Sequence, residues 1–359
     1  MSRTTASHPT VLITGSAGLI GSRLAAALAN EYSVVGLDVK PPKGPEAVGE
    51  WVECDLTKAE SVEQSLEKVR VSHGPHLASA IHLAAYYDFT GQPSALYDEL
   101  TVNGTRRLLE QLQRFEVEQF VFSSSLLVLQ AAESGDVLNE ESPTEATWDY
   151  PNSKLAAEEV IKNLHGKIPA VVLRIAGVYD EDCHSIPIGQ QIRRIYEKQM
   201  ESYFFPGDAD HGQAFVHLDD LIDCFRKTIE RRQSLGAYET FLIAEPDVMS
   251  YEELQDLIGE ELHGREWPTI RIPKTVAKAG AWVKEKLAGE EGETFIKPWM
   301  VDLADAHYPV DPTRASRELG WNPHHRLRAT LPEMLRRLKQ DSEGWYKAQG
   351  FPAENIERE

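Results

Sequence analysis

The stretch 10-TVLITGSAGLIGSRLAAALAN-30 decides the fold of the first half of this chain. Residues 10–14 form an almost continuous apolar run, which is typical of a strand buried on both faces of a parallel sheet. Glycines spaced G-x-x-G-x-x-G follow, and residues 19–30 then repeat apolar side chains at helical spacing. A buried strand that turns over glycines directly into a helix predicts a βαβ unit.

The same alternation continues to about residue 180. Further strands are expected at 33–38, 50–55, 79–85, 119–125 and 170–179, and helices at 61–70, 95–115 and 152–164. This pattern predicts an α/β fold with a Rossmann-type doubly wound parallel sheet, covered by helices on both faces. Residues 1–180 would form this first domain.

Beyond residue 180 the alternation is lost. Prolines, aromatic residues and longer loops become more frequent, as in SYFFPGDADHGQ at 202–213. We expect residues 181–359 to form a smaller, mostly helical C-terminal substrate-binding lobe, with parts of 213–245 and 290–312 returning to the first domain. The final stretch, from residue 344, is expected to be peripheral.

Composition and charge exclude several classes of function. The 359 residues carry a net charge of −20, which disfavours nucleic acid and anionic membranes as partners. No apolar run approaches the ~20 residues of a membrane span, and the polar first ten residues are unlike a secretory signal. The separated cysteines Cys54, Cys183 and Cys224 indicate free thiols and a cytoplasmic location. The histidines show no ligand spacing, so no metal site is expected.

The glycines of the first turn predict a nucleotide site. Gly15, Gly18 and Gly21 would let backbone N–H groups approach a pyrophosphate at the N-terminus of the following helix. Asp38 ends the second expected strand, where a carboxylate can accept both ribose hydroxyls of NAD and repel the extra phosphate of NADP. Lys40 beside it would soften this preference, and Asp38 could instead be a solubilising strand end. We predict NAD as the cofactor.

A catalytic group is indicated by TWDYPNSKLAAEE at 147–159. Tyr150 stands four residues before Lys154 at a helix start, so both lie on one face, and the ammonium would lower the phenol pKa from about 10. Ser125 ends the strand QFVFSSS, where its hydroxyl can hold a substrate oxygen while Tyr150 moves the proton. The alternative is an ordinary helix start. The serines at 123–125 lack the flanking glycines of the G-x-S-x-G nucleophile elbow, so the sequence does not indicate a serine hydrolase.

With these motifs in order, the sequence resembles the extended short-chain dehydrogenase/reductase family, which includes nucleotide-sugar epimerases and dehydratases, dihydroflavonol reductases and 3β-hydroxysteroid dehydrogenases. The resemblance covers nearly the whole chain. It rests on VLITGSAGLIGSRL, DL at 55–56, IHLAA at 81–85, TVNGTRRLLE at 101–110, FVFSSS, YPNSK, LRIAGVY at 173–179, FVHLDDL at 215–221 and ELGWNP at 318–323.

The resemblance implies roles for the matching positions. Tyr150 would be the acid/base, Lys154 its partner and a contact of the nicotinamide ribose, and Ser125 the catalytic hydroxyl. Asp55 could equally cap the following helix, and Asn103 could kink the helix it lies in. The implied cofactor contacts are Gly15, Gly18, Leu19, Ile20 and Gly21 at the pyrophosphate, Asp38 at the ribose, Asp55 and Leu56 at the adenine, Leu83, Ala84 and Ala85 along the cofactor, and Asn103 near the nicotinamide.

The chain departs from the sugar-nucleotide members at two positions that contact a diphosphate. Gly177 stands where many epimerases carry Asn, and Gln213 stands where they often carry Arg. Leu126 and Leu127 replace the Asp-Glu pair of the sugar 4,6-dehydratases, so dehydration by that mechanism is not expected. A diphosphate-bearing substrate is therefore less well supported than an uncharged one.

Bulky residues suggest an apolar pocket suited to a hydroxy-ketone, terpenoid, steroid or phenolic substrate. The predicted substrate contacts are Tyr87 and Ser125. The alternative is that several of these residues pack the core of the smaller lobe. The candidates are Tyr86, Tyr87, Phe89, Trp148, Tyr203, Phe204 and Phe205.

The expected function is that of an NAD-dependent oxidoreductase which moves a hydride between nicotinamide and a secondary alcohol or ketone. The alternatives are a nucleotide-sugar epimerase that retains its NAD, and a non-catalytic NAD-binding regulator. The resemblance also implies a homodimer through the helices that carry NGTRRLLE and YPNSK. Leu155, Val160, Ile161 and Leu164 could be buried there, or could face the sheet instead.

Overall fold

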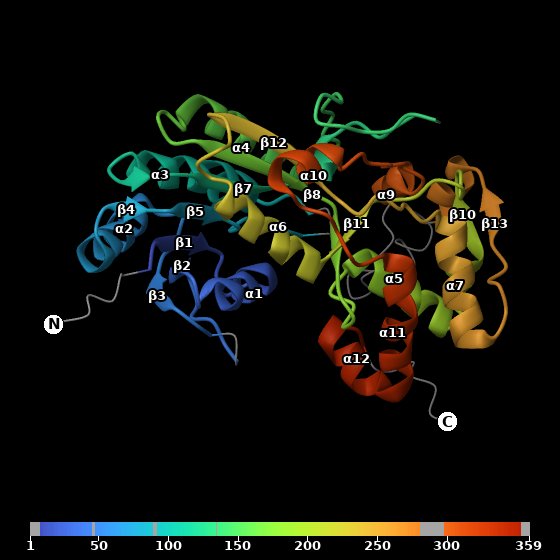
Figure 1. The fold of residues 1–359 in the computed structure, drawn as a ribbon. Coiled ribbons are helices and arrows are strands. Elements are labelled where there is room, and N and C mark those ends of the chain that lie inside the picture. Colours follow the sequence, from blue (N-terminus) through green and yellow to red (C-terminus); the bar gives the residue numbers. More distant parts are fainter. Residues whose placement is uncertain (1–7, 45–46, 89–91, 134, 281–297, 353–359) are drawn as a thin grey trace.

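A computed structural model describes residues 8–44, 47–88, 92–133, 135–280 and 298–352. Its main sheet contains seven parallel strands in the order β12-β8-β7-β5-β1-β2-β3 (Figure 1). The order runs outward from β1 in both directions, so the doubly wound sheet is confirmed. The strands are β1 (Thr10–Thr14), β2 (Ser33–Asp38), β3 (Glu50–Glu53), β5 (Ser79–His82), β7 (Phe120–Ser125), β8 (Ala170–Ile175) and β12 (Tyr238–Ile243).

Helices cover both faces of this sheet. Successive strand residues point to opposite sides, so apolar strands place side chains on both faces that the helices bury. In β1, Val11 and Ile13 enter one buried cluster and Leu12 enters the other. The first cluster lies under α1 (Leu19–Leu28), α6 (Leu218–Glu230) and α10 (Thr313–Leu319). The second lies under α2 (Ala59–His73), α3 (Asn103–Leu112) and α4 (Asp149–Leu164).

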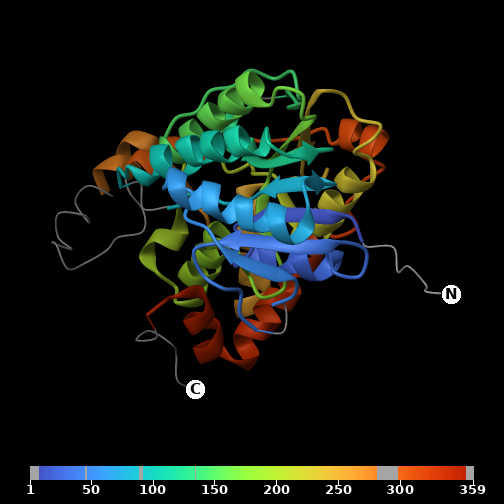
Figure 2. The same cartoon turned by 90° about the vertical axis from the view of Figure 1, so that its left-hand side faces the viewer.

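The second lobe, at the right of Figure 1 and turned in Figure 2, is mostly helical and has its own buried cluster. Its helices are α5 (Ile186–Tyr196), α7 (Tyr251–His263), α9 (Pro298–Leu303), α11 (Leu327–Gln340) and α12 (Ser342–Gln349). Parallel pairs join β10 (Phe204–Pro206) to β13 (Ile270–Ile272), β9 (Gly177–Tyr179) to β11 (Phe215–His217), and β4 (His76–Leu77) to β6 (Glu116–Val117). Short helical turns are η1 (Tyr97–Val102), η2 (Leu126–Val128) and η3 (Met200–Tyr203).

Two expectations about these elements were wrong. The strand expected over 170–179 divides, because Ala176 still donates to Ile243 O of β12 whereas Gly177 donates to Ala214 O and starts β9. The helix expected over 95–115 begins as the π-helix η1, whose last hydrogen bond runs from Asn103 N–H to Asp98 O. The other predicted elements are present, with ends that shift by a few residues.

The C-terminal stretch is not peripheral as far as the structure describes it. Trp345 is 6% exposed and Tyr346 is fully buried in the core of the second lobe. The Tyr346 hydroxyl donates to Glu197 Oε1 at 2.9 Å. Two aromatic side chains at helical positions anchor α12, which composition alone did not reveal. Residues 353–359 lie outside the described part.

The apolar side chains of α4 pack inside the protein. Val160 and Ile161 belong to the cluster under the main sheet, and Leu164 packs against it. Leu155 packs against the cluster on the other side. These residues face the sheet rather than a partner, and the homodimer stays a prediction. The domain division at residue 180 likewise stays a prediction. Within the described residues, no helix is long and apolar enough to cross a membrane.

The first turn leaves no room for a side chain at Gly21. A Cβ there would lie 2.2 Å from Gly15 O. We expect Gly21→Ala to lower the free energy of unfolding by ~1–3 kcal/mol, as overpacking typically does, and to weaken NAD binding. Thermal unfolding and NAD titration would measure both effects. Gly280→Ala is the control, because a Cβ at Gly280 meets nothing within 4 Å. A Gly21→Ala protein with wild-type stability and affinity would contradict this account.

Candidate active site

The glycine turn lies against the loop that follows β5. Gly15 has a φ of +70°, and a Cβ on it would come within 2.9 Å of Ala84 N. Ala84 N–H also approaches Thr14 Oγ1 at 3.3 Å, and Leu83 N–H donates to Thr14 O. The predicted pyrophosphate turn and the predicted Leu83–Ala85 segment are therefore neighbours at the carboxyl end of the sheet, where dinucleotides bind in such folds.

The Asp38 carboxylate reaches back to the same turn. Its Oδ2 accepts a hydrogen bond from Ala17 N–H at 3.0 Å, and its Oδ1 accepts from Lys40 N–H at 3.2 Å. Asp38 is thus more than a solubilising strand end, because its carboxylate is held beside the turn predicted to bind the pyrophosphate. The Lys40 side chain is exposed. This arrangement fits an adenosine ribose, and the ribose contact stays a prediction.

Asp55 and Asn103 have strong local partners. Hydrogen bonds from Thr57 and Lys58 hold the pKa of the Asp55 carboxyl below its usual value, which favours its role in the turn before α2. Leu56 is buried beside Gly104 in the core. Asn103 lies at the junction of η1 and α3 and donates from Nδ2 to Glu99 Oε1 at 3.2 Å. Asp55 does not cap α2, because the N-cap position is Lys58 and it has no side-chain cap. The junction supports the alternative that Asn103 lies at a kink, and the cofactor contacts of these residues stay predictions.

Ser125, Tyr150 and Lys154 come together although they lie on different elements. Ser125 ends β7, and α4 begins at Asp149, so Tyr150 occupies its first turn. The Ser125 hydroxyl lies near enough to the Tyr150 phenol to lower its pKa. Lys154 Nζ lies 5.9 Å from the centroid of the Tyr150 ring. In the crossover from β7 through α4 to β8, the helix begins on the side of the sheet where β7 ends. The first turn of α4 therefore lies beside Ser125.

Burial opposes the expected lowering of the Tyr150 pKa by Lys154, which stays a prediction. Burial raises the pKa of Tyr150 to about 12, against a smaller lowering by the Ser125 hydroxyl. Burial also lowers the pKa of Lys154 to about 7, while the Glu158 charge opposes that change. Lys154 is 3% exposed, and its Nζ donates to Ser123 O at 2.7 Å rather than to the phenol. Removal from water is the largest effect on the pKa of both groups.

A buried ion pair behind Lys154 was missed from the sequence. Arg174 of β8 donates to Glu158 of α4 from Nη2 at 2.8 Å and from Nε at 3.2 Å. Ser124 Oγ donates to Glu158 Oε1 at 2.5 Å. All three side chains are buried. The available signal was the position of Glu158, four residues after Lys154 on the same helical face.

Aromatic rings surround the phenol. Tyr87 and Tyr150 meet edge to face with centroids 4.9 Å apart, and the Trp148 ring lies 5.6 Å from Tyr150. Tyr87 is 49% exposed, so it borders the site from the solvent side. Tyr203 instead stacks on Trp267 in the core of the second lobe, as the packing alternative expected. Tyr86 packs edge to face on Tyr97, and Phe89 lies outside the described residues.

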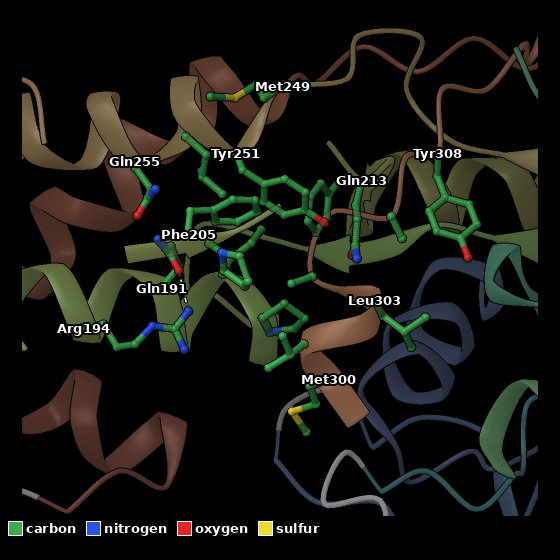
Figure 3. A pocket seen from close by; sticks show the side chains of 18 of the residues that line it. Gln191, Arg194, Phe205, Gln213, Met249, Tyr251, Gln255, Met300, Leu303 and Tyr308 are labelled. Carbon is green, nitrogen blue, oxygen red and sulfur yellow. Dashed lines mark hydrogen bonds between the residues drawn. The ribbon is translucent and has the colours of Figure 1, made fainter. Parts of the chain in front are cut away.

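A cavity of about 260 Å³ lies between the two lobes next to this site (Figure 3). Leu127 and Trp148 connect it to the catalytic residues, and Gln213 also lines it. Its walls are mainly apolar and come from α5, α7, α9, β10 and the flanking loops. Characteristic side chains are Phe204, Phe205, Phe215, Met249, Met300 and Leu303.

Several polar pocket residues were missed from the sequence. Gln191 and Arg194 come from α5, and Tyr251 and Gln255 come from α7. The Tyr251 hydroxyl is buried without hydrogen-bond geometry to any described residue, although the Gln213 amide is near enough to affect its pKa. No motif marks these positions. Helical spacing in α5 and α7 was the only signal, and it did not reveal which face lines a cavity.

A group of His and Asp side chains near β11 has geometry unsuited to a cation. His217, Asp219 and His325 have potential ligand atoms within 4.8 Å of one another. However, Asp219 N–H donates to His217 Nδ1, so the proton of the neutral ring is on Nε2. The rings of His217 and His325 also stack, with their centroids 3.9 Å apart.

Comparison with protein families identifies the chain. Residues 11–244 match the model of the NAD dependent epimerase/dehydratase family. The chain belongs to this family. It is an NAD-dependent enzyme of the extended short-chain dehydrogenase/reductase type, as the motifs predicted, and the non-catalytic alternative is no longer needed.

Relatives with different activities match across most of their length. UDP-glucose 4-epimerase of Bacillus subtilis (strain 168) is 24% identical, with 94% of this chain and 99% of that protein covered. Short-chain dehydrogenase/reductase family 42E member 1 of Danio rerio is 28% identical, with 87% and 84% covered. Sterol-4-alpha-carboxylate 3-dehydrogenase ERG26, decarboxylating, of Candida albicans is 23% identical, with 92% and 98% covered.

Solved structures agree on the fold. MoeE5 in complex with UDP-glucose and NAD matches with a TM-score of 0.67 and 21% identity, over 93% of this chain and all of that chain. At this identity the match supports the architecture alone. The substrate of this family member therefore has to be inferred from its own pocket residues.

The lowered pKa of Lys154 predicts a pH-dependent stability. Between about pH 7 and pH 10 the unfolded lysine holds a proton that the folded one has largely lost, so this group makes the free energy of unfolding rise with pH, by at most ~1.4 kcal/mol per unit. Lys154→Met removes this contribution. The stability of the variant relative to wild type should therefore fall between about pH 7 and pH 9 in urea titrations.

The matched control for this experiment is Lys162→Met, an exposed lysine of the same helix. It corrects for the loss of one positive charge from the protein. If the free energy of unfolding of Lys154→Met relative to wild type instead stays constant or rises with pH, the folded lysine keeps its proton.

Proposed function

We propose that the chain is an NAD-dependent oxidoreductase that moves a hydride between nicotinamide and a secondary alcohol or ketone of a small, fairly apolar substrate. The observation that carries this proposal is the apolar cavity that begins at Leu127 and Trp148, beside Ser125 and Tyr150. Apolar pockets with a few convergent polar groups are typical of such substrates.

The glycine at position 177 disfavours a diphosphate-bearing substrate. A Cβ at Gly177 would lie 2.8 Å from the Phe215 ring, so the Asn of many epimerases would have to displace a pocket-lining side chain. Gln213 lines the cavity at the position where those relatives often carry Arg. Among the described lining residues, Arg194 is the one cation, and Glu201 is present as well. A diphosphate would find little compensating charge here.

The catalytic residues suit hydride transfer at a carbinol. Ser125 would hold the substrate oxygen, and Tyr150 would take its proton during oxidation or return it during reduction. Lys154 would approach the cofactor ribose and support the phenolate. NAD, when bound, accepts or supplies the hydride. A phenol whose pKa is raised to about 12 keeps its proton at neutral pH, which favours its action as an acid toward a ketone.

Replacement of the phenol tests this assignment. We expect Tyr150→Phe to lower kcat by ~10²–10⁴-fold, the usual contribution of a general acid, with little change in NAD affinity. Turnover would be followed as NADH absorbance with a panel of apolar secondary alcohols and ketones. Tyr203→Phe is the control, because its ring stacks on Trp267 away from Tyr150. Equal activity of Tyr150→Phe and wild type would remove Tyr150 from the mechanism.

The second candidate is a nucleotide-sugar epimerase, favoured by the similarity to the Bacillus subtilis epimerase over nearly its full length. The state of the cofactor in protein purified without added nucleotide distinguishes the two. Tightly retained NAD released only by denaturation would favour the epimerase, and empty protein that binds NAD reversibly would favour the dehydrogenase. A homodimer and a cytoplasmic location remain part of the proposal.

A further inference from the structure

The two ends of the cavity differ in chemistry. One end adjoins the reacting site, since Leu127 and Trp148 line it and the Trp148 ring contacts Tyr150. Tyr308 belongs to this end, because it lies in the same buried cluster of the main sheet against which Leu127 packs. Figure 3 shows Tyr308 on one side of the cavity and a group of polar side chains on the opposite side. That group consists of Gln191, Arg194 and Gln255.

Arg194 is the chemically distinctive member of this polar end. Its Nη2 donates to Gln191 Oε1, the one hydrogen bond of this guanidinium among the described residues (Figure 3). Burial lowers its pKa to about 10, against the opposing effect of the Glu201 carboxylate. The guanidinium still carries a full charge at neutral pH. Its other four N–H donors make no hydrogen bond to any described residue, in a mainly apolar cavity.

The neighbours of Arg194 favour a planar acceptor. Gln255 is fixed by a 3.0 Å hydrogen bond from its Nε2 to Thr269 Oγ1. Gln191 accepts from Arg194 through its Oε1, so its Nε2 amide group can donate to a ligand beside the guanidinium. A guanidinium fork matches the two oxygens of a carboxylate, and such charge-assisted pairs are stronger in an apolar setting.

We infer that the substrate carries a carboxylate at the end remote from its reacting carbinol, and that Arg194 binds it. The substrate class is then a hydroxy- or keto-acid with an apolar body between its two functional groups. This inference rests on the proposed function, because it uses the same cavity. It is separable from that function, because carboxylate recognition can be measured without turnover.

The experiment compares matched ligands that differ only in charge. Three carboxylates with compact apolar bodies, 2-naphthoate, 3-phenylpropanoate and cyclohexanecarboxylate, are each paired with the corresponding primary carboxamide. Binding is measured by calorimetry at saturating NAD. We expect at least one carboxylate to bind wild-type protein roughly tenfold or more tightly than its carboxamide, the gain typical of a charge-assisted hydrogen bond.

Variants assign the preference to Arg194. Arg194→Gln should abolish the carboxylate preference while the carboxamide still binds, and Arg194→Lys should retain part of it, since the charge stays and the planar fork is lost. Glu201→Gln should strengthen carboxylate binding, because it removes a like charge from the cavity. Arg193→Gln is the matched control, because Arg193 pairs with Glu197 at 2.8 Å and does not line the cavity. Circular dichroism would check that each variant is folded.

The outcomes separate this inference from the proposed function. Equal affinity of every carboxylate and its carboxamide in wild type overturns it, as does a preference that survives Arg194→Gln or disappears equally in Arg193→Gln. A carboxylate preference without any NAD-linked turnover of secondary alcohols would uphold the inference and reject the dehydrogenase. Turnover of neutral alcohols without a carboxylate preference would do the reverse.

Discussion

The buried ion pair between Arg174 and Glu158 is the contact on which the catalytic arrangement depends. It joins β8 to α4, and Ser124 of β7 shares the same carboxylate. Loss of one partner would leave an uncompensated buried charge, which typically costs ~3–5 kcal/mol. Because Glu158 lies two helical turns after Tyr150 and one after Lys154, the pair sets how α4 sits over the sheet. The positions of the phenol and the ammonium relative to Ser125 follow from it.

Burial also decides the protonation of the catalytic residues. The same enclosure that holds Tyr150 beside Ser125 raises the pKa of its phenol, and it lowers the pKa of the Lys154 ammonium. Burial thus favours the neutral form of each group, although Lys154 remains partly protonated at neutral pH. A neutral phenol is an acid ready to protonate a substrate oxygen, and a lysine with a pKa of about 7 responds strongly to any charge placed near it. The chemistry of the site is set as much by dehydration as by pairing.

The substrate cavity is built from elements that the two lobes contribute separately. The β9–β11 pairing places Phe215 opposite Gly177, and the Phe215 ring leaves no space for a side chain at position 177. The substitution of an epimerase contact by glycine and the apolar wall of the cavity are thus one structural feature. Arg194 adds a cation at the far end, so the two ends of the cavity differ chemically. That polarity favours an elongated apolar substrate with one reacting end and one anchoring end.

The sequence by itself determined the parallel sheet, the glycine turn, Asp38 beside it and the grouping of Ser125, Tyr150 and Lys154. These depend on periodicity and on motifs whose parts lie at fixed positions along strands and helices, so local patterns carry them. It did not determine the protonation of Tyr150, the Arg174–Glu158 pair, the buried aromatic residues of α12 or the polar end at Arg194. Each of these arises from contacts between residues far apart in the chain, and only the tertiary structure decides which helical face is buried, which faces a cavity, and how much water remains around a charge.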